Sequence, residues 1–170
     1  MDNPDLSTYI EQILNRSEFR RYQCVNGIRY DITVHNAALP ADCKVHSALG
    51  AGPQLLPDDT SQAEGFTDYA NGELIRDAIG SQRRNARSAI GVKQDGTVVW
   101  VMVAQVNESG GMTLAELAEY MTSLAIQKAL NLDGGSSASL YLAPQLLQGR
   151  TTQTNSSLRP VKSVLLLPSS

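Results

Sequence analysis

The chain has 170 residues, of which 42% are hydrophobic and 18% charged, and its formal net charge at pH 7 is −3. This length and composition are typical of a single globular domain over residues 1–170 and exclude a disordered or fibrous protein. The slightly acidic balance, without a Lys and Arg cluster, argues against a nucleic-acid partner, and no apolar run is long enough for a transmembrane segment.

The first half of the chain predicts one helix, one hairpin and a long irregular segment. A helix is expected over residues 3–16, with Asn3 as its N-cap. Asn26-Gly27 is typical of a two-residue hairpin turn, which would place Cys24 opposite Arg29. Residues 28–34 alternate apolar and polar side chains, so one face of that strand should be buried.

Residues 37–87 are rich in glycine and proline and weakly periodic, so we expect mainly loops there. A short helix is expected within residues 69–82. A long irregular segment inside a compact domain is often functional. This part of the chain is therefore a candidate contributor to a site.

The second half has clearer patterns. A hairpin is expected over residues 87–104, and its unbroken apolar run from residue 98 indicates a strand covered on both faces. A helix should begin after Thr113, which forms a capping box with Glu116. Three more strands are expected, over residues 129–132, 138–143 and 161–167. This mixture of hairpins and helices predicts an α+β or mixed α/β fold, with mostly antiparallel and mixed sheet and a few packed helices.

The two cysteines, Cys24 and Cys43, leave two alternatives open. They are either reduced and buried, as in a cytosolic protein, or joined in a disulfide, as in an exported one.

The stretch Asn131 to Ser137, "NLDGGSS", is the first candidate site. Asp133 follows a predicted strand, where side chains emerge from a sheet, and the amides of Gly134 and Gly135 can approach an anion closely. Ser136 and Ser137 add hydroxyl groups. Taken alone, the stretch is more often an Asp-Gly turn followed by surface serines.

Other candidates are weaker. Arg87 could fork onto a phosphate or carboxylate, or be a surface charge at the start of a strand. Gly50 and Gly52 could cradle a ligand or form a tight corner, and Glu108 is a possible second carboxylate. His35 and His46 have no acidic residue or cysteine at ligand spacing and no nearby nucleophile, which argues against zinc and a hydrolase triad. No cofactor is predicted, and a divalent cation stays open.

Several segments together resemble one family, the phosphodiester glycosidase domain, many of whose members are bacterial. They are "ALGAGPQLLPDD", "RSAIGVKQDGTVVWVMV", "GGMTLAELAEYM", "ALNLDGGSSASLYL" and "RPVKSVLLL", in this order. The resemblance covers residues 48–167. It implies hydrolysis of the C1–O bond of a sugar-1-phosphodiester, so the expected partner is a glycan phosphodiester, such as one in a cell-envelope polymer.

The resemblance also implies roles for the candidate residues. Asp133 would act at the sugar, and Arg87 would clamp the phosphate, because a phosphate leaving group needs neutralisation more than protonation. The remaining residues would bind substrate: Asn131, Gly134, Gly135, Ser136, Ser137, Gly50 and Gly52. The family motif has a third glycine where this chain has Ser136, and a serine or threonine where it has Ala138.

Family members begin with a further strand and a Phe-rich turn, which we expect this chain to lack. It would then associate with that missing segment or with itself. Most members are exported or lumenal, which implies an extracytoplasmic location and favours a Cys24–Cys43 disulfide. The alternatives to an enzyme are a module that binds a phosphorylated glycan and a structural envelope protein.

Overall fold

The computed structural model of the protein describes residues 9–107, 109–149, 160 and 164–166. Two α-helices and one short 3-10 helix accompany eleven strands in this part of the chain. The helices are α2 (Ile10–Leu14), α3 (Leu114–Ser123) and the 3-10 helix η1 (Gly135–Ser137). The strands are β1 (Ser17–Cys24), β2 (Gly27–Val34), β3 (Cys43–Gly50), β4 (Gln54–Leu56), β5 (Thr67–Ala70), β6 (Glu73–Asp77), β7 (Arg87–Lys93), β8 (Val98–Val103), β9 (Ile126–Asn131), β10 (Ser139–Leu142) and β11 (Gln145–Gln148).

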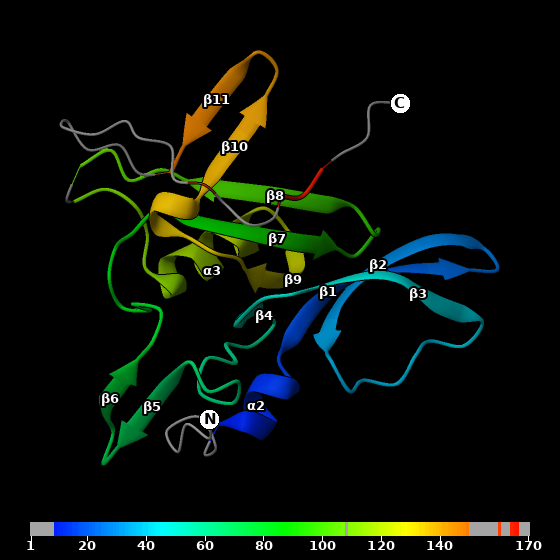
Figure 1. The fold of residues 1–170 in the computed structure, drawn as a ribbon, viewed down its shortest axis with the longest axis horizontal. Helices are drawn as coiled ribbons and strands as arrows, with labels where there is room; N and C mark the ends of the chain where they lie inside the picture. The colour runs from blue at the N-terminus through cyan, green and yellow to red at the C-terminus, as the bar shows by residue number, and fades with distance from the viewer. Residues whose placement is uncertain (1–8, 108, 150–159, 161–163, 167–170) are drawn as a thin grey trace.

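A four-stranded sheet in the order β4-β9-β7-β8 forms the centre of the molecule (Figure 1). One face packs against α3, where Leu117 and Met121 are fully buried. The helix approaches this face so closely that a Cβ on Gly91 would lie 3.0 Å from Met121 Cε of α3. Ile90 and Leu130 point to the other face and pack with Ile32 of a second sheet. The core therefore has two layers, one on each side of the central sheet.

The second sheet has the order β2-β1-β3 and lies to the right in Figure 1. The disulfide Cys24–Cys43 joins β1 to β3 at a position where the two residues are register partners. The hairpin turn is not Asn26-Gly27 as predicted, because Cys24 pairs with Gly27 and not with Arg29. Since β1 pairs on both edges, its register must satisfy two neighbouring strands and not one turn alone.

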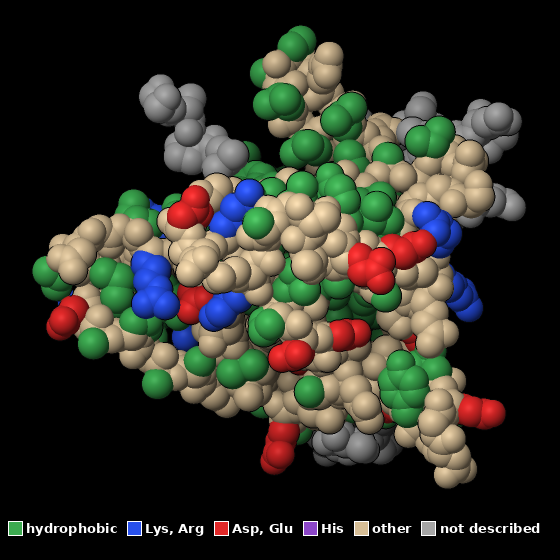
Figure 2. Space-filling view, turned by 180° about the vertical axis from the view of Figure 1, so that it is seen from behind, with side chains coloured by type: hydrophobic (Ala, Val, Ile, Leu, Met, Phe, Trp, Pro, Cys, Tyr) green, Lys and Arg blue, Asp and Glu red, His purple; other side chains and the backbone are tan. Residues whose placement is uncertain are grey.

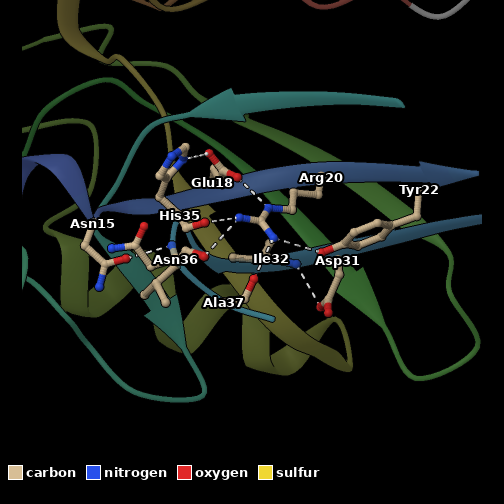
Figure 3. Close-up of polar contacts among 10 residues, drawn as sticks. Asn15, Glu18, Arg20, Tyr22, Asp31, Ile32, His35, Asn36 and Ala37 are labelled. Carbon is tan, nitrogen blue, oxygen red and sulfur yellow. Dashed lines mark hydrogen bonds and ion pairs between the residues drawn. The ribbon is translucent and has the colours of Figure 1, made fainter. Parts of the chain in front are cut away.

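Burial in this second sheet also differs from the expected alternation. Only Ile32 of β2 is fully buried, and Ile28 is 53% exposed. On β1 the opposite face buries Glu18 and Arg20, which form a polar network with the His35 ring and with the main-chain carbonyls of residues 34, 35 and 37 (Figure 3). Charged residues are buried here because each has a partner.

The segment from residue 37 to 87 is less irregular than predicted. It contains β3, β4 and the hairpin β5–β6, which projects at the lower left of Figure 1. The prediction of a short helix within residues 69–82 was wrong, because the segment forms strand β6 and the turn before it. Asn71 and Gly72 both have positive φ, 51° and 81°, and form the two-residue turn of that hairpin. An Asn-Gly pair favours such a turn, so the signal was present in the sequence.

The second half agrees more closely with expectation. The β7–β8 hairpin, the α3 capping box of Thr113 and Glu116, and strands β9 and β10 are all confirmed. However, β8 is half-buried along its whole length, because it is an edge strand of the central sheet. Helix α2 buries none of its described residues, and the expected cap Asn3 lies outside the described residues.

Two further differences concern the C-terminal region. Strand β11 was not predicted; with β10 it forms a hairpin that projects from the top of the molecule (Figure 1). Apolar side chains gather over this part of the surface (Figure 2), including exposed Tyr141 and Leu142. Residues 164–166 of the expected last strand belong to no strand, and the remaining residues of that segment lie outside the described part.

The fold class is confirmed in part. The sheets are antiparallel throughout the described strand pairs, with no mixed sheet among them, and few helices pack on them. The protein is mostly β, so an α+β description fits it only loosely.

Candidate active site

An open cleft of about 620 Å³ lies where the C-terminal ends of β3 and β9 meet the start of β7. It brings together seven of the nine site residues expected from the sequence. These are Gly50, Gly52, Arg87, Asn131, Asp133, Gly134 and Gly135. The other lining residues are Ile13, Arg16, Ala51, Phe66, Ala78, Ile79, Asn85 and Leu132. Because β7 and β9 are antiparallel neighbours, the start of β7 and the end of β9 lie at the same end of the central sheet.

Asp133 is exposed in this cleft, and neither its carboxylate nor its N–H has a hydrogen-bond partner among the described residues. Both sides of it are tied to the start of β7. Leu132 N–H donates to Ser88 O at 2.8 Å, and Gly135 N–H donates to Ala86 O at 2.8 Å. Asp133 is thus an unpaired carboxylate on a backbone that is held in place.

Gly134 and Gly135 allow this close approach of the two backbones. A Cβ on Gly134 would lie 2.7 Å from Ala86 O, and Gly135 has φ of 60°. The stretch does not form an Asp-Gly turn between two paired strands, because the strands on its two sides do not pair with each other. Strand β9 belongs to the central sheet and β10 to a separate hairpin, so the glycines redirect the chain from one to the other.

Asn131 is 5% exposed and holds the corner after β3. Its Nδ2 donates to Gly52 O at 3.1 Å, and its main-chain O accepts from Gly52 N–H at 3.0 Å. Its Oδ1 is buried and has no hydrogen-bond partner among the described residues. A buried polar atom without a partner is unusual, and here it belongs to a residue that lines the cleft.

Arg87 is 3% exposed, and main-chain carbonyls surround its guanidinium. Nε donates to Met112 O at 3.0 Å and Nη1 to Ile79 O at 3.2 Å. Nη2 donates to Gly80 O at 2.6 Å and to Arg83 O at 2.8 Å. Four of the five N–H groups are therefore occupied, and the bidentate phosphate clamp predicted from the sequence lacks two free donors.

Burial lowers the pKa of Arg87, and the charge of Asp77 opposes this effect. No carboxylate of the described residues lies within ion-pair distance of Arg87. An arginine in this state stays protonated. Arg87 thus brings a positive charge to the cleft and fixes the loop of residues 79–83 against β7.

The remaining candidates lie elsewhere. Ser136 and Ser137 follow in η1 and are not among the described residues that line the cleft. His35 is bonded to Glu18, and His46 is exposed on β3. The described residues contain no group of three His, Cys, Asp or Glu side chains that could hold a metal ion. Glu108 lies outside the described residues.

The sequence interpretation missed Arg16, Phe66 and Asn85 as lining residues. Asn85 lies two residues before Arg87, so its position near the site could have been anticipated. Arg16 and Phe66 carry no local signal, because they come together at the cleft only through the contacts of Arg16 with residues 64–66. Asn85 Oδ1 accepts from Ala86 N–H at 2.9 Å, which stabilises the turn that leads into β7.

Most of the chain, including every residue that lines the cleft except Ile13, matches one family model. The phosphodiester glycosidase model matches residues 15–167. The chain belongs to the phosphodiester glycosidase family. Its resemblance to that family, first inferred from residues 48–167, therefore extends further toward the N-terminus. No curated protein matches the sequence.

One solved structure shows the same fold, and a second is similar in sequence over part of the chain. The catalytic domain of zebrafish N-acetylglucosamine-1-phosphodiester alpha-N-acetylglucosaminidase, auto-inhibited by its pro-peptide, is 18% identical with a TM-score of 0.58. The match covers 86% of this chain and 49% of that chain. A hypothetical protein from Synechocystis is 26% identical over 79% of this chain and 31% of its own, with a TM-score of 0.47. The chain thus spans about half the length of the zebrafish domain and a third of the second protein.

Proposed function

We propose that the protein is a hydrolase that cleaves the glycosidic C1–O bond of a sugar-1-phosphodiester. The observation that carries this proposal is Asp133, an exposed carboxylate without a described partner, in a cleft that also contains two arginines. In a family of phosphodiester glycosidases, this arrangement offers a carboxylate for the sugar and positive charge for the phosphate.

The chemistry is compatible with a single carboxylate. Asp133 is the only acidic residue among the described residues that line the cleft. Glycoside cleavage usually needs a second carboxyl group to protonate the leaving oxygen. A phosphate monoester is a weak base and can leave without this help, provided that nearby cations stabilise its charge. The charge of Arg87 acts in this way at the wall of the cleft.

The substrate-binding residues in this proposal lie at the end of β3 (Gly50 and Gly52) and at the end of β9 (Asn131, Gly134 and Gly135). Asn131 presents its free Oδ1 to a sugar hydroxyl or amide N–H. The main-chain N–H group of Asp133, next to Gly134, approaches the phosphate. Gly50 and Gly52 shape the opposite wall, where Gly52 N–H is already bonded to Asn131. Ser136 and Ser137 remain candidates for contacts with a larger glycan next to the cleft.

The experiment measures hydrolysis of an N-acetylglucosamine-1-phosphodiester in water enriched in oxygen-18. This sugar is the first choice because the name of the zebrafish relative contains it. Cleavage at C1–O places the label on the sugar and releases an unlabelled phosphate monoester. Cleavage at P–O would place the label on the phosphate and contradict the proposal.

Two variants complete the experiment. Asp133→Asn should lower the rate by at least about a hundredfold if the carboxylate acts at the sugar. Asp58→Asn is the matched control, because Asp58 is also exposed, forms none of the described hydrogen bonds or ion pairs and does not line the cleft. Binding of the diester without turnover would favour the alternative function, a phosphorylated-glycan binding module.

We also propose an extracytoplasmic location. The Cys24–Cys43 disulfide supports it, since such bonds persist mainly in oxidising compartments. No helix in the described part of the chain is long and apolar enough to cross a membrane. The test is cell fractionation with thiol labelling, in which recovery of the reduced protein from the cytosol would contradict the proposal.

A further inference from the structure

We infer that Arg16, and not Arg87, is the residue that directly contacts the phosphate group of the substrate in the cleft. This inference rests on the proposed function and assigns to one residue the recognition of the sugar-phosphate anion. It follows from which hydrogen-bond donors of the two cleft arginines are free, how each guanidinium is held, and which charges surround it.

Arg16 lies between α2 and β1, and two groups hold its guanidinium. Nε donates to Glu64 O at 2.9 Å, and Nη2 donates to Gly65 O at 3.4 Å. The guanidinium carbon lies 3.8 Å from the centroid of the Phe66 ring, and both side chains line the cleft. Stacking on an aromatic ring fixes the plane of the guanidinium before a ligand arrives, which reduces the entropy lost on binding.

Three of the five N–H groups of Arg16 form no hydrogen bond with a described residue. Two parallel N–H groups are enough for a bidentate bond to a phosphate. Arg87 has only one such N–H group, because four main-chain carbonyls occupy the others. The two arginines therefore differ in function: Arg87 fixes the loop of residues 79–83, whereas Arg16 keeps donors for a ligand.

The charges around Arg16 leave its own charge available. No carboxylate of the described residues lies within ion-pair distance of it, although six other ion pairs occur in that part of the chain. Glu64, the acidic residue whose charge acts on Arg16, is 4% exposed and accepts hydrogen bonds from Ser17 N–H and Oγ, Gln54 N–H and Thr60 Oγ1.

Burial lowers the pKa of Arg16; the charge of Glu64 opposes this effect and that of Arg76 adds to it. Arg76 is itself paired with Asp68. Arg16 is therefore a protonated, half-buried cation, and no described carboxylate forms an ion pair with it. An anionic ligand would form that ion pair.

The test is a calorimetric titration of the disulfide-intact protein with two probes, N-acetylglucosamine 1-phosphate and neutral N-acetylglucosamine. Arg16→Gln should weaken binding of the sugar phosphate by tenfold or more, on the order of a lost hydrogen-bonded charge pair. Binding of the neutral sugar should change less than about twofold, since it offers no anion. Arg16→Lys, which keeps the charge but not the fork, should lie between Arg16→Gln and the unmodified protein.

The matched control is Arg21→Gln, which removes the same charge from a half-buried residue that forms none of the described side-chain contacts and lies outside the cleft lining. It should bind both probes as the unmodified protein does. Thermal unfolding of each variant checks that the fold is intact.

Three outcomes overturn the inference: unchanged sugar-phosphate binding in Arg16→Gln, equal weakening of both probes, or no sugar-phosphate binding by the unmodified protein. Equal weakening would mean that Arg16 only supports the shape of the cleft through Phe66. Selective loss of sugar-phosphate binding supports the inference even if the protein hydrolyses no diester, and in that case the proposed hydrolase activity alone is rejected.

Discussion

Asn131 and Gly52 are held together by two hydrogen bonds although they lie 79 residues apart in the sequence. Gly52 N–H donates to Asn131 O at 3.0 Å, and Asn131 Nδ2 donates to Gly52 O at 3.1 Å. This contact joins the corner after β3 to the end of β9 and so forms one wall of the cleft. Gly52 also lies close to buried Glu64, so a larger residue at position 52 would have no room for its side chain.

Gly52→Ala is expected to destabilise the protein by about 2 kcal/mol or more. A Cβ would lie 2.5 Å from Glu64 Oε2 and 3.0 Å from the Phe66 ring, and φ is 128°. Urea denaturation measures the change in the free energy of unfolding. Gly50→Ala is the control in the same cleft, because nothing lies within 4 Å of its Cβ, and it should change stability by less than about 0.5 kcal/mol. Equal effects of the two substitutions would contradict this prediction.

Arg87→Lys should lower the free energy of unfolding by about 2–4 kcal/mol. A lysine keeps the charge but cannot reach the four carbonyls that Arg87 bonds, and several of them would be left unpaired inside the protein. Arg84→Lys is the control, because Arg84 is half exposed and paired with Glu116, and it should change stability by about 0.5 kcal/mol at most. If Arg87→Lys is as stable as Arg84→Lys in thermal and urea unfolding, the hydrogen bonds of Arg87 to the four carbonyls do not stabilise the fold.

Glu18 should make stability depend on pH in the acidic range. Burial acts to raise the pKa of Glu18, but hydrogen bonds with His35 and Arg20 outweigh it, so this pKa is lowered (Figure 3). The stabilisation is therefore fully present above the unfolded value of about 4.3 and is lost as pH falls below it.

Glu18→Gln tests this dependence. At pH 7 it should cost about 3 kcal/mol, because buried Arg20 loses its carboxylate. The difference from the unmodified protein should shrink as urea denaturation is repeated at lower pH. Glu119→Gln, which removes an exposed carboxylate that forms none of the described hydrogen bonds or ion pairs, should follow the unmodified protein at every pH. A difference that stays constant down to pH 3 would show that Glu18 does not titrate in this way.

The Cys24–Cys43 disulfide should contribute about 3 kcal/mol of stability, since it closes a loop across 19 positions of the sequence. Dithiothreitol should lower the urea midpoint of the unmodified protein but not that of the Cys24→Ala/Cys43→Ala double variant. The disulfide lies at the opposite end of β3 from Gly50. Sugar-phosphate binding in the cleft should therefore persist in the double variant, and loss of binding with an intact fold would contradict this separation.

Several elements could be predicted from the sequence because their signals are local. The capping box of Thr113 and Glu116 begins α3, and a turn over residues 93–96 joins β7 to β8. The Asn71-Gly72 turn of β5–β6 carried an equally local signal, which weak periodicity around it obscured. Pairing with strands on both sides overrode a local turn preference at Asn26-Gly27, and that register was missed.

The candidate site divides in the same way. The "NLDGG" stretch and Arg87 were found from the sequence, and all lie in one cleft. The partners of Arg87 were not predictable, because they are carbonyls of Ile79, Gly80, Arg83 and Met112 brought together by the fold. Arg16 was missed altogether, since its proximity to the cleft depends on contacts with Glu64 and Gly65, about 48 residues away.

The sequence by itself therefore determined the family, most of the second-half elements, and the carboxylate and glycines at the end of β9. Those features depend on residue types and spacings within a few positions of one another, where caps, turns and alternation act. Only the tertiary structure decided which arginine has free donors, which glycine is packed against Glu64, and that the chain after Asp133 passes to a separate hairpin. These properties depend on contacts between residues tens of positions apart, and hydrogen-bond saturation and burial of a side chain arise only when such segments pack together.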